Sequence, residues 1–228
     1  MKASIRLACC LFMLGTGMAM APQLRVQVPA GVQDDLEALR RALLQPGEGA
    51  RAEREGAIDQ LLLRKDALAH GVLARSLHDG DDQDGRGRFL LDNLARRLVL
   101  AGDPVFGDEK TRAAVLDPYV DAWLRPFARG ELGLGDRSTP EFRVATLRCF
   151  RALTFRERSQ QLERTSQGVD LERVRAALLL AGRSRDLGLG PWIAERLDHR
   201  DLAATARQAL SDLTFVKESF TDRAAFLD

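Results

Sequence analysis

The chain has 228 residues, of which 45% are hydrophobic and 29% are charged, a composition typical of a soluble globular protein. Its formal net charge is +1, and because dedicated nucleic-acid-binding proteins carry a strong basic excess, we expect no nucleic-acid partner. Aromatic residues make up only 6%, whereas Ala, Leu and Arg are abundant, which favours an all-α fold.

Residues 1–21 have the pattern of a secretory signal peptide. Lys2 and Arg6 form a basic start, an uncharged apolar run follows, and small residues end the segment. The apolar run is shorter than the roughly 20 residues that a membrane-spanning helix needs. Pro22 disfavours cleavage directly before it, so we expect cleavage after Ala19, with an uncleaved N-terminal anchor as the alternative. The sequence therefore predicts an exported protein, periplasmic or secreted, with no other membrane contact.

We expect an extended lead-in over residues 22–31 and a single helical domain over residues 32–228, in which apolar residues recur at helical spacing. The spacing predicts helices around residues 32–43, 58–62, 68–77, 90–98, 108–128, 139–153, 170–181, 191–197 and 202–213.

Two of these segments carry distinct local signals. The helix after Thr139 should begin with Thr139 as its cap and Pro140 in its first turn. The helix over residues 108–128 should bend before Pro118.

Residues 156–168 are hydrophilic, and we assign no helix to them. Phe220 and Phe226 lie beyond the last helix and are expected to cover the open end of the domain.

Residues 191–215 form the clearest unit, a hairpin of two amphipathic helices joined by a polar turn whose Asp should cap the second helix. The unit recurs: shifting the sequence by 120 places residues 70–77 over residues 190–197 with apolar residues aligned, and residues 118–124 provide a third start. Since such a hairpin has one apolar side that it cannot bury alone, the repeats should stack.

The turn of this hairpin carries Asp201 with Arg207 six positions later, and Asp82 and Arg88 repeat that spacing. This pattern resembles HEAT-like repeats, which belong with the armadillo-like folds, over roughly residues 50 to 215. The resemblance implies an α-solenoid of stacked antiparallel helical hairpins that offers a surface for protein partners.

The densest group of possible metal ligands is the acidic run Asp79, Asp81, Asp82 and Asp84. An EF-hand loop needs an acidic residue at its first position and Glu at its twelfth. With Gly85 as the required sixth-position glycine, those two places are held by Gly80 and Leu91. We therefore interpret the run as a solvated turn and assign no metal site, with loose Ca²⁺ binding as the alternative.

No catalytic motif is found around the remaining candidate residues. His70, His78 and His199 lack the spacing of a zinc site and have no cysteine nearby in sequence. Removal of the signal leaves Cys149 as the single cysteine, so no internal disulfide can form; its apolar neighbours place it in the core, with a reactive thiol as the alternative. We therefore assign no catalytic, cofactor-binding or metal-binding residue and no cofactor.

Three other features have structural interpretations. The Leu-Gly-Leu-Gly segments at residues 132–135 and 187–190 follow no strand and lack the third glycine of a dinucleotide loop, so we interpret them as joints between loops and helices. Trp123 and Trp192 occupy apolar helical positions and are expected in the core, with exposure on a binding face as the alternative. The arginine-rich helix faces are best explained as solvated, with anion binding as the alternative; they include Arg96, Arg97, Arg148 and Arg151.

These observations favour a non-enzymatic protein–protein interaction scaffold of the bacterial cell envelope. A curved stack of pre-ordered helices can bind a protein without losing much ordering entropy. The alternative is an enzyme, or an accessory subunit, whose site is assembled from several helix faces without a local motif. A buried Asp or Glu beside His70 or Cys149 would favour the enzyme.

Overall fold

The fold is taken from a computed structural model that describes residues 30–79, 85–124, 127, 139–167 and 170–216. All regular structure within these ranges is helical, which confirms the predicted all-α class. The expected signal peptide and most of the expected lead-in lie outside the described residues, and so do Phe220 and Phe226.

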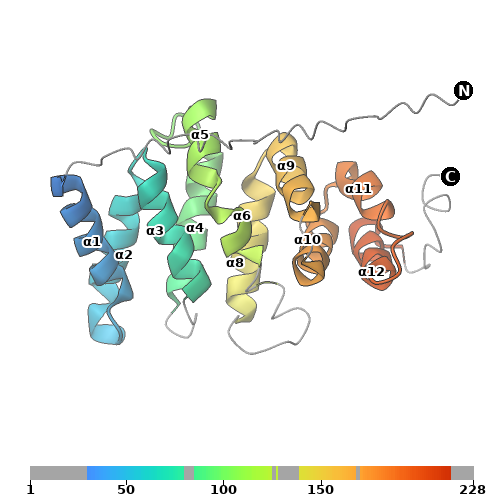
Figure 1. The fold of residues 1–228 in the computed structure, drawn as a ribbon, viewed down its shortest axis with the longest axis horizontal. Coiled ribbons are helices and arrows are strands. Elements are labelled where there is room, and N and C mark those ends of the chain that lie inside the picture. Colours follow the sequence, from blue (N-terminus) through green and yellow to red (C-terminus); the bar gives the residue numbers. More distant parts are fainter. Residues whose placement is uncertain (1–29, 80–84, 125–126, 128–138, 168–169, 217–228) are drawn as a thin grey trace, which may run out of the picture.

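Figure 1 shows the helices side by side in one row, with α1 at one end and α12 at the other. In chain order they are α1 (Ala30–Leu44), η1 (Glu48–Ala50), α2 (Arg51–Leu62), α3 (Ala67–Asp79), α4 (Arg86–Val99), α5 (Glu109–Leu116), α6 (Tyr119–Ala122), α8 (Pro140–Ala152), α9 (Phe155–Ser166), α10 (Leu171–Arg183), η3 (Leu187–Leu189), α11 (Gly190–Ala194) and α12 (Ala203–Thr214).

Contacts between helices follow the order of the chain. The pairs α1–α2, α3–α4, α9–α10 and α11–α12 are each in contact. A second series of contacts joins these pairs, because α2 packs on α4, α4 on α8, α8 on α10 and α10 on α12. On the other side of the row, α3 contacts α1, α5 and α6. Neighbouring pairs thus bury their apolar faces against one another.

The caps predicted from local sequence signals are present at α8. Its first turn begins with Pro140, and the Thr139 hydroxyl accepts a hydrogen bond of 3.2 Å from the Phe142 N–H. A residue before the helix that accepts from a free N–H of the first turn satisfies a donor that the helix itself cannot. Asp170 caps α10 in the same way, through the N–H groups of Glu172 and Arg173.

Residues 108–128 do not form one bent helix. The segment instead holds α5 and α6, which are separated at Pro118. Proline lacks an N–H and its ring collides with the carbonyl four residues earlier, so a helix that reaches it stops unless the neighbouring packing holds a kink. The expected bend is therefore a break.

Helix α9 was not predicted. Its apolar content is low, and the residues it buries are Gln161, Leu162 and Thr165. Its start is nevertheless a full capping box, in which Thr154 accepts from the N–H of Glu157 and the Glu157 carboxylate accepts from the N–H of Thr154.

The final hairpin also differs from the prediction. Its first helix, α11, is short, and turns follow it up to Leu202. The predicted Asp cap is wrong, since Leu202 occupies the N-cap position of α12 and no side chain caps the helix. Burial of Leu189, Ile193 and Leu197 on one side agrees with the predicted apolar face.

Candidate functional site: an arginine-lined groove

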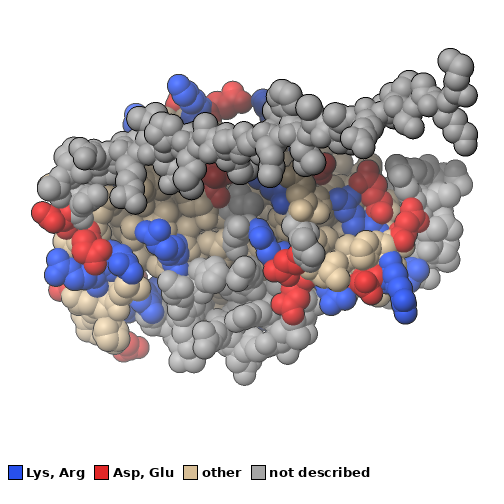
Figure 2. All heavy atoms as spheres, viewed as in Figure 1, with Lys and Arg blue, Asp and Glu red and all other residues tan. Residues whose placement is uncertain are grey.

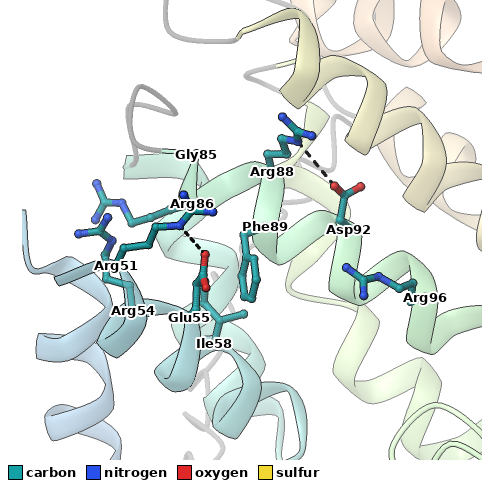
Figure 3. A pocket seen from close by; sticks show the side chains of 10 residues that line it. All are labelled: Arg51, Arg54, Glu55, Ile58, Gly85, Arg86, Arg88, Phe89, Asp92 and Arg96. Carbon is teal, nitrogen blue, oxygen red and sulfur yellow. Dashed lines mark hydrogen bonds and ion pairs between the residues drawn. The ribbon is translucent and has the colours of Figure 1, made fainter. Parts of the chain in front are cut away.

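A hollow of about 380 Å³ lies between α2 and α4. We call it the arginine groove (Figure 3). It is lined by Arg51, Arg54, Glu55, Ile58, Gly85, Arg86, Arg88, Phe89, Asp92 and Arg96.

Two of its arginines are bound to the protein backbone. Arg54 is only 2% exposed, and its guanidinium donates to the carbonyl oxygens of Gln45 and Gly47 at 2.9 and 2.5 Å. Arg86 donates to the Leu43 carbonyl at 3.1 Å. These bonds hold the end of α1 and the turn after it against the wall of the groove, so Arg54 and Arg86 position the site.

On one side of the groove, Arg51 forms an ion pair of 2.8 Å with Glu55, one helical turn further along α2. The hydrogen bond and charge of Glu55 raise the pKa of Arg51. The Arg51 side chain is 72% exposed, so its charge stays accessible to a ligand.

On the other side, Asp92 of α4 lies between two arginines. Arg88 approaches its carboxylate at 3.7 Å, and Arg148 of α8 also pairs with it. Arg88 and Asp92 also line a second hollow of about 190 Å³, which is bounded by α8 and includes Glu141. The arginine groove therefore continues from α4 onto α8.

Phe89 lies between these two charged sides (Figure 3). Its ring is half-buried, and the side chain of Ile58 beneath it is 1% exposed. The floor of the groove is thus apolar, and its walls carry five guanidinium groups against two carboxylates. Because the whole chain has a formal net charge of +1, this positive excess is local. On the face shown in Figure 2, basic and acidic side chains are mixed.

His70 is buried among aromatic rings. Its Nε2–H donates to the Arg64 carbonyl at 2.9 Å, and its Nδ1 accepts from the Tyr119 hydroxyl at 3.0 Å. The Phe106 ring packs edge-on against it at 5.6 Å. Burial lowers the pKa of His70 and keeps the imidazole neutral.

Cys149 is also fully buried, and its thiol donates to the Leu91 carbonyl at 2.9 Å. Burial raises its pKa far above the usual range, so the sulfur stays protonated and is a poor nucleophile. The buried carboxylate of Asp103 is bound instead to Arg97 at 2.8 Å and to two backbone N–H groups. Among the described residues, no carboxylate forms a hydrogen bond with His70 or Cys149, although the charge of Asp66 acts on the pKa of His70 and that of Asp92 on the pKa of Cys149.

The other candidate residues are dispersed. Trp123 is fully buried, as predicted, whereas Trp192 is half-buried, with the Arg196 guanidinium 4.4 Å above its ring. His199 is exposed on the surface. Residues 187–189 form η3 and Gly190 begins α11, which agrees with the predicted joint between a loop and a helix.

Several predicted features fall outside the described residues. These are the side chains of His78 and Asp79, the residues Asp81, Asp82 and Asp84, and residues 132–135. In the part of the chain that is described, no three His, Cys, Asp or Glu side chains come together as a metal site. None of the described helices has the length and apolarity needed to cross a bilayer.

The sequence did not identify the arginine groove, although it named Arg96 and Arg148 as possible anion-binding residues. Arg51 is separated from Arg96 by 45 positions and lies on a different helix, so only helix packing reveals their proximity. The available signal was the density of arginine along α2 and α4.

Comparison of the chain with known protein families, characterised proteins and solved structures finds no match. The class of the protein is therefore described from its fold and groove alone. It is an all-α protein in which two neighbouring helices, α2 and α4, line an open groove rich in arginine.

Proposed function

We propose that this protein is a non-enzymatic protein-binding scaffold of the bacterial cell envelope, built as an α-solenoid of stacked helical hairpins similar to HEAT repeats. The single observation that carries the proposal is the pattern of helix contacts. Helices α2, α4, α8, α10 and α12 contact one another in chain order, and each of them except α8 is the second helix of a contacting pair. Contacts between nearest neighbours are the organising feature of helical repeat proteins.

Such a stack suits binding more than catalysis. Its helices are ordered before a partner arrives, so association costs little conformational entropy. The groove between α2 and α4 has accessible charged side chains and an apolar floor, the two elements that a protein interface combines. Two fully buried groups, His70 and Cys149, form hydrogen bonds within the fold and serve its packing.

Site-specific photo-crosslinking in the native cells would test the scaffold. A benzoylphenylalanine is placed in turn at three exposed positions, Leu68 on α3, Val144 on α8 and Phe155 on α9, and the products are separated by mass. We expect at least one position to give a crosslinked polypeptide of discrete mass that survives high salt. Absence of a polypeptide from all three positions, with turnover of a small molecule by the purified protein, would contradict the proposal.

The envelope location rests on residues 1–21 and has a separate test. Cell fractionation should place the protein in the periplasm or the medium, and the N-terminus of the purified protein should be Met20 if cleavage follows Ala19. Recovery of the full-length chain from the membrane would indicate the uncleaved anchor, and recovery from the cytoplasm would overturn the location.

A further inference from the structure

We propose that the arginine groove binds an acidic segment of a partner protein in which an apolar side chain is flanked on both sides by Asp or Glu. This inference rests on the proposed scaffold function and names the chemistry of its partner.

The first step concerns the charges available to such a segment. Arg51 and Arg88 have side chains that are 72% and 56% exposed, and each is paired with a carboxylate of its own helix. Ion pairs made by exposed arginines are weak, so a carboxylate from a partner can replace or join them at little cost. Arg96 is exposed at the end of the same groove.

The second step concerns the floor. Phe89 is half-buried and separates the Arg51 side of the groove from the Arg88 and Arg96 side (Figure 3). An apolar side chain placed on the Phe89 ring removes apolar surface from water, which favours binding. The acidic residues before and after it would then face arginines on opposite sides.

The third step distinguishes an acidic protein segment from a nucleic acid or another polyanion. Glu55 and Asp92 lie within the groove, one on each side of Phe89 (Figure 3). A continuous row of phosphates would approach both carboxylates and be repelled by them. A peptide can place its acidic residues beside arginines and neutral residues beside Glu55 and Asp92, so the interleaved charges favour a peptide.

The fourth step concerns length. The groove shares Arg88 and Asp92 with the adjoining hollow on α8, where Arg148 supplies a further positive charge and Val144 a further apolar surface. A segment longer than one side chain can therefore lie across α2, α4 and α8.

Fluorescence anisotropy with labelled peptides tests the proposal on the full mature chain. The probe is Gly-Ser-Glu-Glu-Leu-Glu-Glu-Ser-Gly, compared with one peptide in which Gln replaces every Glu and another in which Ala replaces Leu. We expect the first peptide to bind most tightly, the Gln peptide to lose binding, and the Ala peptide to bind several-fold more weakly. Binding should also weaken between 50 and 300 mM salt, because exposed charges are screened.

Protein variants locate the site. The double substitution Arg51→Glu with Arg96→Glu should weaken binding of the acidic peptide by about tenfold, the size expected from losing two exposed charge contacts. The matched control, Arg75→Glu with Arg200→Glu, changes the net charge equally at two exposed positions outside the groove and should bind within twofold of the original chain. Circular dichroism and thermal unfolding confirm that both variants are folded.

The outcomes separate this inference from the scaffold function. Equal binding by the groove variant and its control, or tighter binding of a single-stranded oligonucleotide than of the peptide through Arg51 and Arg96, would overturn the inference. If photo-crosslinks still form from Leu68 or Phe155 in that case, the scaffold function stands without it. Peptide binding that depends on Arg51 and Arg96 would support the inference whether or not crosslinks form at the three exposed positions.

Discussion

The contact between α2 and α4 and the contact between α10 and α12 occupy equivalent places in the row of helices, yet the first encloses a groove and the second is closed. Between α10 and α12, a methyl group added at Gly182 would lie 2.5 Å from the Ala209 carbonyl oxygen. The backbones therefore touch, and residues 176–182 of α10 are all buried. Between α2 and α4, long side chains line a hollow of about 380 Å³.

The difference follows from the size and charge of the residues at each contact. Alanine and glycine allow two helices to approach until their backbones meet, and no polar side chain has to be removed from water at the contact. Arginine keeps its head group in water while its stem covers apolar surface, so helices that face each other through arginines stay apart. The same architecture thus provides rigidity at one end and an accessible surface at the other.

The largest effect is expected where the two regions are joined. Arg112 of α5 forms two bonds with Glu157 of α9, at 2.5 and 3.0 Å, and donates to the Leu98 carbonyl at the end of α4. The two side chains are 12% and 21% exposed. Arg112→Ala should lower the free energy of unfolding by about 3 kcal/mol, the lower end for a buried pair. Urea unfolding measures the change.

The matched control is Arg156→Ala. Arg156 also joins α9 to α5, through Glu109 at 3.4 Å, but these side chains are 76% and 89% exposed. The control should change the free energy of unfolding by about 0.5 kcal/mol or less. Similar losses in both variants would show that the link between the two regions does not depend on the burial of Arg112.

The pair also predicts acid sensitivity. Burial acts to raise the pKa of Glu157, but the bonds and charge of Arg112, with those of Thr154, outweigh it and lower the pKa. A carboxyl group with a lowered pKa stabilises the fold above its unfolded-state pKa of about 4.3, and this contribution is lost as the pH falls through the folded-state pKa.

Gly182→Ala tests the closed end directly. The added methyl group meets backbone atoms of Ala209 that cannot rotate away, so α10 and α12 must separate, and we expect a loss of about 2 kcal/mol in unfolding free energy. Gly56→Ala on α2 is the matched control, since its methyl group would meet no atom within 4 Å and should raise stability by roughly 0.5 to 1 kcal/mol. A stabilising Gly182→Ala would show that the helices are not in close contact there.

These two ends differ in how far they could be predicted. The helices at the closed end were predicted because their signals are local: Asp170 caps α10, and alanines and leucines recur at helical spacing along it. Helix α9 was missed because it has few apolar residues to show helical spacing, although the capping box of Thr154 and Glu157 was present in the sequence. A bend was predicted before Pro118, whereas the structure has two separate helices, α5 and α6, on either side of it.

The arginine groove was beyond prediction from local patterns. Arg51, Arg88 and Arg96 are common surface residues when each is considered on its own helix, and whether they line one groove depends on the distance between α2 and α4. Helix separation depends on side-chain packing at the contact, which sequence periodicity does not specify.

A smaller effect, dependent on pH, is expected from His70. Its pKa is lowered by burial, against the opposing influence of the Arg64 carbonyl and Asp66, while Arg97 lowers it further. In the unfolded chain the His70 imidazole binds a proton at about pH 6.5, whereas in the folded chain it stays neutral. The free energy of unfolding therefore falls as the pH drops below that value, by at most about 1.4 kcal/mol per pH unit. Unfolding between pH 7 and 5 should show a flatter dependence in His70→Phe. An unchanged slope would mean that His70 does not remain neutral.

The smallest change in stability is expected inside the groove itself. Arg96 is exposed and has no partner among the described residues, so Arg96→Ala should change the free energy of unfolding by about 0.5 kcal/mol or less. Arg54→Ala provides the comparison within the same groove, because it removes a buried side chain together with its charged hydrogen bonds to the Gln45 and Gly47 carbonyls and should cost about 2 kcal/mol. Urea unfolding distinguishes the two. Folding would then depend on the buried arginine while the exposed one is left for a ligand, and an equal cost for both would assign the whole groove to the fold.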